Sequence, residues 1–231
     1  MKKIIMIALI FCVFQANSQT NPTPEKNIKI GKGKNKTSSD ALVISLNTDI
    51  WQKVPDSIAA RGINQGVSAA GMYNIRMGQG NFSFAFGLGI SSHNFYSDGI
   101  LGLDTTGKIS QFTPTSISYK INKLSLTYFD IPVEFRFKTS SKFRIAVGFK
   151  FGFTMDVHTK YKGTDLSDGE GSVLVKEKKI ANIEPMSYAL TARIGYKWAI
   201  LNASYSLNSI FKKDVGPQMY PISVGITVIP F

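Results

Sequence analysis

The chain has 231 residues, a formal net charge of +12 and one cysteine, Cys12. Cys12 lies in an N-terminal segment that is expected to be removed, so disulfides, cysteine nucleophiles and thiolate metal sites are excluded from the remainder. The basic balance suits anionic lipid or acidic partners. Nucleic acid is not an expected partner, because the first residues predict export.

The first 18 residues have the order of a secretory signal peptide. Lys2 and Lys3 precede the apolar run IIMIALIFCVF, and Ala16 and Ser18 stand at the small-residue positions before the cleavage site. The apolar run is shorter than the roughly 20 residues that a membrane-spanning helix needs. Residues 1–18 are therefore predicted to be cleaved off, with a buried N-terminal helix as the alternative.

Residues 19–40 predict a flexible basic tail in the periplasm. The segment contains five lysines, two prolines and almost nothing to bury. Within it, GKGKNKT is similar to a phosphate-binding loop but lacks the Gly-Lys-Ser/Thr ending that such a loop requires. Nucleotide binding is therefore not expected.

From residue 41 onward, apolar residues recur at every second position in eight segments. Several segments are 12 to 16 residues long, whereas about 9 to 11 suffice for a tilted transmembrane strand. Long connections alternate with short ones, as in small outer-membrane barrels. The pattern predicts an all-β protein, an eight-stranded antiparallel up-and-down transmembrane β-barrel over residues 41–231, placed in the outer membrane with its long loops outside the cell. The segments are 41–51, 66–77, 81–96, 124–138, 142–156, 186–197, 199–208 and 220–230.

The two faces of the predicted strands differ in kind. In segment 81–96 the even positions from Phe82 to Ile90 are large and apolar, whereas the odd positions are Ser, Ala and Gly. The interior of an eight-stranded barrel has just enough room for its side chains. The small and charged set is therefore expected inside, and the phenylalanine rows against lipid. A soluble barrel or sandwich with its apolar face inward is the alternative.

Charged residues on the inward face predict a network in the lumen. A three-residue loop, Thr139 to Ser141, would set Asp130 opposite Lys150 and Glu134 diagonal to Arg144, and charges removed from water need such partners. A narrow anion pore is the alternative for so basic a lumen, although eight strands leave little open channel. The network residues are Asp130, Glu134, Arg136, Arg144, Lys150 and Arg193.

The segment LTYFDIPVEFRFK, Leu126 to Lys138, resembles the strand YxEIPxxxKyK of PorT-like outer-membrane β-barrel proteins. Phe129, Asp130, Ile131 and Pro132 stand at the matching positions, with Asp130 in place of the commoner Glu. The resemblance implies an outer-membrane barrel, and export-machine proteins as partners, since the founding relatives are linked to protein secretion. The terminal Phe231 resembles the signal by which the barrel-assembly machinery recognises its clients, which implies that machinery as a partner during biogenesis.

No catalytic residue, cofactor or metal site is predicted. His93 and His158 are candidates for a Ser–His hydrolase such as the small-barrel lipid A deacylases, but alternation places both inside the barrel or in loops, away from the lipid-facing rim. The loop TDLSDGEG, 164–171, does not have the spacing of a calcium loop. The expected function is that of a non-enzymatic barrel, structural or associated with protein export. A lipid-modifying enzyme and a narrow pore are the alternatives.

Aromatic residues near the ends of the segments predict girdles at the membrane surfaces. They are Trp51, Tyr73, Tyr96, Tyr188, Tyr196, Trp198 and Tyr205.

Overall fold

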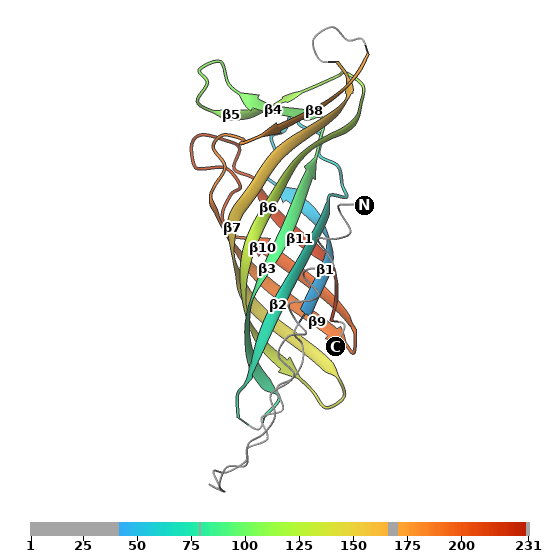
Figure 1. Ribbon diagram of the computed structural model, residues 1–231, viewed down its shortest axis with the longest axis vertical. Coiled ribbons are helices and arrows are strands. Elements are labelled where there is room, and N and C mark those ends of the chain that lie inside the picture. Colours follow the sequence, from blue (N-terminus) through green and yellow to red (C-terminus); the bar gives the residue numbers. More distant parts are fainter. Residues whose placement is uncertain (1–41, 79, 166–170, 230–231) are drawn as a thin grey trace, which may run out of the picture. The chain divides into compact units, whose positions relative to one another are not determined.

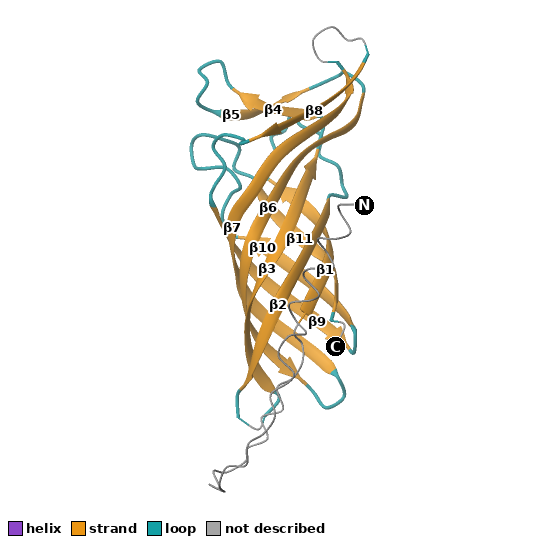
Figure 2. Ribbon diagram, viewed as in Figure 1, coloured by secondary structure: helices purple, strands orange, loops and turns teal. Residues whose placement is uncertain are grey.

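The computed structural model describes residues 42–78, 80–165 and 171–229, which form strands joined by turns and loops (Figures 1 and 2). The predicted signal peptide, the basic tail and Phe231 lie outside the described residues. Within the described part, no helix has the length and apolar character needed to cross a membrane. The strands of the barrel are β1 (Leu42–Gln52), β2 (Gln65–Arg76), β3 (Phe82–Tyr96), β6 (Tyr119–Lys138), β7 (Phe143–Thr164), β9 (Met186–Tyr196), β10 (Ala199–Ser206) and β11 (Tyr220–Val228).

These eight strands form a closed antiparallel barrel. Their order around the sheet is β6-β3-β2-β1-β11-β10-β9-β7, and the pairing of β6 with β7 closes the ring. Closure gives each strand a partner on both sides, which a sheet surrounded by lipid requires. The predicted fold class is confirmed, and each of the eight predicted segments corresponds to one strand of the barrel.

The barrel has a turn end and a loop end. At the turn end, short connections around Gly78, Lys142 and Lys197 join neighbouring strands, and each of these residues has a positive φ. At the loop end lie the long connections and three further strands, β4 (Gly99–Leu103), β5 (Ser110–Pro114) and β8 (Ser172–Lys178) (Figure 1). β4 and β5 form a hairpin, whereas β8 pairs with the last residues of β7.

Strands β6 and β7 are longer than predicted, with 20 and 22 residues. The sequence pattern assigned the start of β6 and the end of β7 to loops. Between the Thr127–Asp156 and Tyr128–Thr154 pairs the register shifts, so that Met155 is an extra residue on β7. Such a bulge exchanges the two faces for the rest of the strand.

Apolar side chains cover the outside of the barrel, and polar ones fill much of its interior. On β3 the outward Phe82, Phe84 and Phe86 are exposed, whereas on β6 the inward Asp130 and Glu134 are buried. Phe82 packs against Phe135 and Phe137 of β6, at ring-centroid distances of 5.4 and 5.0 Å. This inverted arrangement confirms the predicted assignment of the faces and excludes the soluble alternative with an apolar interior.

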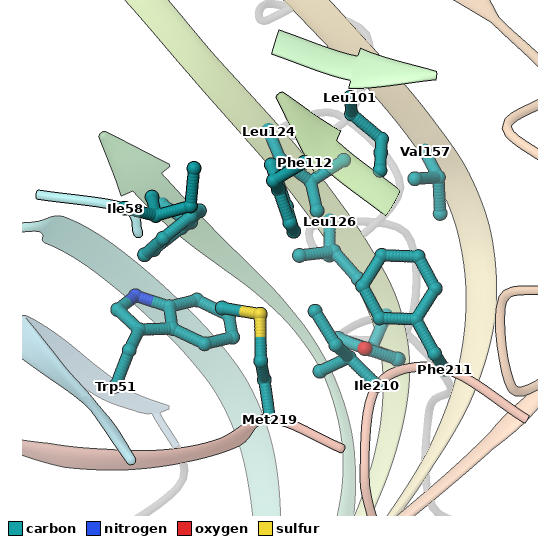
Figure 3. Packing of buried hydrophobic residues seen from close by; sticks show 12 residues of the cluster. Trp51, Ile58, Leu101, Phe112, Leu124, Leu126, Val157, Ile210, Phe211 and Met219 are labelled. Carbon is teal, nitrogen blue, oxygen red and sulfur yellow. The ribbon is translucent and has the colours of Figure 1, made fainter. Parts of the chain in front are cut away.

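A cluster of apolar side chains closes the interior at the loop end (Figure 3). Its aromatic rings form a chain of contacts. The ring-centroid distances are 5.3 Å from Trp51 to Phe95, 5.4 Å from Phe95 to Phe112 and 6.2 Å from Phe112 to Phe211. Trp51 is only 8% exposed, so its predicted place in an outer girdle is wrong; it shares the inward face of β1 with Val43 and Asp49. We call this cluster the apolar cap: Trp51, Ile58, Phe95, Leu101, Phe112, Leu124, Leu126, Tyr128, Val157, Ile210, Phe211 and Met219.

Candidate functional site: the lumen and the outer rim

Glu134 is the centre of the charged lumen. It is 1% exposed, Arg136 Nε donates to its Oε2 at 2.8 Å, and Arg193 Nη1 lies 2.9 Å from its Oε1. Arg136 also donates from Nη1 to Asn74 Oδ1 at 3.2 Å. A buried carboxylate needs charged partners of this kind, because removing a charge from water is costly.

Glycine makes room for these side chains. Gly148 of β7 lies directly opposite Glu134, and a Cβ at Gly148 would approach Glu134 Cγ to 2.9 Å. The cavity beside Glu134, Arg136, Arg144 and Arg193 has a volume of about 40 Å³, enough for a few water molecules. The lumen at this level is therefore largely filled by side chains.

The predicted register between β6 and β7 is wrong by two residues. Lys138 pairs with Arg144, Glu134 with Gly148 and Asp130 with Gly152. The turn is longer than three residues, because Thr139 N donates to Phe143 O at 2.9 Å and Lys142 adopts a left-handed backbone. Arg144 thus lies four positions along β7 from the partner of Glu134, and the predicted diagonal placement is not found.

Asp130 and Lys150 form an ion pair in spite of that error. Lys150 Nζ lies 3.5 Å from Asp130 Oδ2 and also 3.5 Å from Ser91 Oγ. Lys150 is two residues from the direct partner of Asp130, a diagonal that a long side chain can span. Residues 139–143 separate the last paired positions, Lys138 and Arg144, and this odd number of five residues keeps both side chains inside, as predicted.

A second buried network surrounds Asp49 and was missed from the sequence. His93 Nδ1 lies 3.1 Å from both carboxylate oxygens of Asp49, and Ser223 Oγ donates to Oδ1 at 2.5 Å. The position of Asp49 on the inward face of its segment was the available signal. His93 points inward as predicted, and its contacts are those of a side chain that holds β1 and β3 together.

His158 lies on the outer face of the barrel, so its predicted inward or loop position is wrong. The bulge at Met155 places Val157 in the apolar cap and turns Asp156 and His158 outward. His158 Nδ1 lies 2.7 Å from Asp156 Oδ2. Ser125 is directly opposite His158, but its hydroxyl donates to Asn94 Oδ1 at 3.0 Å, so that its proton points away from the imidazole.

Of the predicted girdle residues, Tyr73, Tyr196 and Tyr205 are exposed on the outer face, and Trp198 is exposed in the turn between β9 and β10. Among residues 42–78, 80–165 and 171–229, no three His, Cys, Asp or Glu side chains gather in the manner of a metal site. Most of the acidic loop 164–171 lies outside the described residues.

The closed barrel with an apolar exterior and a charged interior defines a transmembrane β-barrel protein. Residues 25–212 match the family model described as outer membrane protein beta-barrel domain, and the chain belongs to this family. Among solved structures, the chain is similar to Ail, the attachment invasion locus protein of Yersinia pestis, in complex with the heparin analogue sucrose octasulfate. The two share 9% identity, with 80% of this chain and 96% of that chain covered and a TM-score of 0.34. No curated protein matches the chain.

Proposed function

We propose that the protein is a non-enzymatic outer-membrane barrel of the PorT-like kind, with a structural or export-associated role. The observation that carries this proposal is the filling of the barrel along its length, by charged side chains toward the turn end and by the apolar cap at the loop end. A filled barrel leaves its loops and its tail to contact other proteins. In this proposal the loop end faces the cell exterior and residues 19–40 lie in the periplasm.

Hydrogen bonds between different loops support a role for the loop end as a binding surface. Ser110 N donates to Val215 O, and Glu184 N donates to Ile210 O, both at 2.9 Å. The side-chain amide of Asn182 donates to Lys108 O at 2.8 Å. Loops that are ordered before binding lose less conformational entropy when a partner binds.

The proposal includes the steps that bring the chain to the membrane. Residues 1–18 are removed during export, the barrel-assembly machinery recognises Phe231, and outer-membrane lipid surrounds the apolar exterior. Export-machine proteins are the proposed partners of the folded barrel.

Co-purification in mild detergent tests the export role. The tip of the β4–β5 hairpin, residues 104–109, contains no residue of the apolar cap, so a Gly-Ser replacement should leave the barrel folded. We expect the native chain to retain export-machine proteins and the tip variant to lose them, while both show a heat-modifiable gel shift. A substitution at the exposed Ser140 of the turn end serves as the control. Equal recovery of partners with both variants would contradict a role for the hairpin.

A lipid-modifying enzyme is the second candidate, and the position of His158 is the observation that favours it. The His158–Asp156 pair lies on the outer face just beyond the apolar Phe153 and Met155, where an acyl chain would arrive. Mass analysis of the lipids in a strain that carries His158→Gln tests it, because this side chain contributes nothing to the interior. We expect lipids identical to those of the parent strain; the loss of a modified species would establish the enzyme. His93 is unsuitable for this test, since its replacement disturbs the buried Asp49.

A further inference from the structure

Three lysines form a row across the outer face at the loop end. Lys123 of β6 pairs directly with Lys160 of β7, and Lys160 pairs directly with Lys176 of β8. Lys178 lies opposite His158, and Lys162 lies two residues beyond Lys160 on the same face. We call Lys123, Lys160 and Lys176 the lysine row.

The contacts of neighbouring residues establish that this face points outward. Leu124, Leu126 and Val157 alternate with it along β6 and β7 and belong to the apolar cap. Lys123 Nζ lies 5.4 Å from the centroid of the Tyr96 ring and donates to Asn94 Oδ1 at 2.8 Å, and both partners belong to the outer face of β3.

Within the described part of the chain, no ion pair involves Lys123, Lys160, Lys176, Lys162 or Lys178. On this face the carboxylate of Asp156 is paired with His158, whereas Glu177 lies opposite Thr159 on the other face. Like charges directly opposite each other destabilise a sheet, so an anion bound across the row would remove a repulsion that the fold otherwise retains.

The row lies just beyond the apolar surface of the same strands. On β6 and β7 the outward phenylalanines end at Phe129 and Phe153, and Lys123 and Lys160 follow within a few residues. With about 3.4 Å per residue and a strand tilt of roughly 40°, the row is on the order of 15 Å above the last phenylalanines. Lysine stems can also extend back along the strand toward the membrane. With their stems extended in this way, the ammonium groups reach down toward the headgroup region, which extends roughly 5–8 Å beyond the hydrocarbon on each side of the membrane.

We propose that the lysine row, with Lys162 and Lys178, binds the phosphate groups of glycolipid headgroups in the outer leaflet. The ammonium groups supply several point charges for phosphate oxygens. The row is continuous with the lipid-facing surface of β6 and β7, which favours a membrane lipid over a soluble polyanion. The assignment to the outer leaflet rests on the orientation given in the proposed function.

Native mass spectrometry of the full chain in detergent, titrated with phosphorylated lipid A, tests the proposal. The variant Lys123→Gln/Lys160→Gln/Lys176→Gln removes the row, whereas Lys108→Gln/Lys212→Gln/Lys213→Gln removes the same charge from loops at some remove in sequence from these strands. Each lysine near an anionic surface contributes appreciably to binding, so we expect the row variant to bind about tenfold or more weakly and the control nearly as the native chain. Native binding should also fall steeply with added salt. A heat-modifiable gel shift verifies that each variant is folded.

Three results would overturn the proposal. The first is equal binding of dephosphorylated lipid A, and the second is an equal loss of binding in the control variant. The third is tight binding of inositol hexakisphosphate without binding of lipid A, which would assign the row to a soluble polyanion. Binding in detergent does not depend on membrane orientation. Labelling of intact cells with a membrane-impermeant amine reagent therefore tests the proposed orientation separately.

Discussion

Strand β6 passes through two environments, and its two ends follow opposite rules. Toward the turn end, Asp130 and Glu134 are inside while Val133 and Phe135 face outward. Toward the loop end, Leu124 and Leu126 are inside, and outward positions carry polar residues such as Ser125.

The difference between the two regions follows from the solvent outside each of them. Where lipid surrounds the barrel, an apolar exterior has no cost and the polar groups must find partners inside. Where the strands extend beyond the membrane, water surrounds them, and the apolar side chains are buried as in a soluble protein. The inward residues of β6 change from apolar to charged between Tyr128 and Asp130. From this change we infer the level of the membrane surface on this strand.

The largest effect is expected from removing the carboxylate at the centre of the charged lumen. Glu134→Ala leaves Arg136 and Arg193 inside the barrel without their shared partner, and breaking a buried ion pair in this way costs about 3–5 kcal/mol. Urea unfolding in detergent micelles measures the loss. Glu134→Gln keeps the shape and part of the hydrogen bonding, so it should lose less; equal stability of Glu134→Ala and the native chain would contradict the assignment.

A comparable loss, confined to the other region, is expected from Phe211→Ala. Phe211 is 1% exposed within the apolar cap, and a phenylalanine cavity costs about 3–5 kcal/mol. The loops should become sensitive to protease while the barrel still shows its heat-modifiable gel shift.

Planar-bilayer recordings of the native chain should show no steady conductance, because the apolar cap and the charged lumen both fill the channel. An open channel in the native chain would favour the narrow-pore alternative.

A pair of lysine substitutions on the outward face of β6 measures where the environment changes. Val133→Lys places a charge in the middle of the apolar surface and should cost about 2–4 kcal/mol, whereas Thr127→Lys lies beyond it and should cost about 0–1 kcal/mol. Unfolding in lipid vesicles provides both values. Equal costs would mean that the membrane surface does not lie between these two positions.

A smaller effect is expected for the ion pair that lies nearest to the change from apolar to charged inward residues. A double-mutant cycle on Asp130 and Lys150 should give an interaction energy of about 0.5 kcal/mol or more, since Nζ and Oδ2 are 3.5 Å apart. Additive effects of the two single variants would show that the pair contributes nothing to stability.

The smallest effect concerns the exposed tip of the β4–β5 hairpin. The hydroxyl of Thr106 and the backbone N–H of Ile109 donate to the carboxylate of Asp104 and lower its pKa from 3.8 to about 2. A lowered pKa means that the contribution to local order is complete above pH 3.8 and is lost as the pH falls through about 2. The protection factor of the Ile109 amide, which corrects for the intrinsic pH dependence of hydrogen exchange, should therefore fall only in that acidic range, and Asp104→Asn should remove this fall.

Much of the candidate site was predictable wherever alternation is unbroken. The inward position of Glu134 and Arg136 follows from the apolar residues between them, because neighbouring side chains on a strand point to opposite faces. The position of His158 was not predictable in this way, because one extra residue at Met155 reverses the faces beyond it. The register of β6 and β7 was missed since it depends on the hydrogen bonds of Thr139 and the backbone of Lys142.

The sequence by itself determined that eight long alternating strands close into a barrel with an apolar exterior. Long strands that alternate apolar and polar residues are accommodated in a membrane only as a closed barrel. It also contained the apolar residues of the long loops, such as Leu101, Ile210 and Phe211, but without a period that would indicate where they pack. Only the tertiary structure decided that these residues fill the loop end of the barrel and that three lysines from β6, β7 and β8 stand side by side. Both arrangements join residues far apart in the chain, and their positions depend on loop paths, registers and a bulge that local side-chain patterns do not encode.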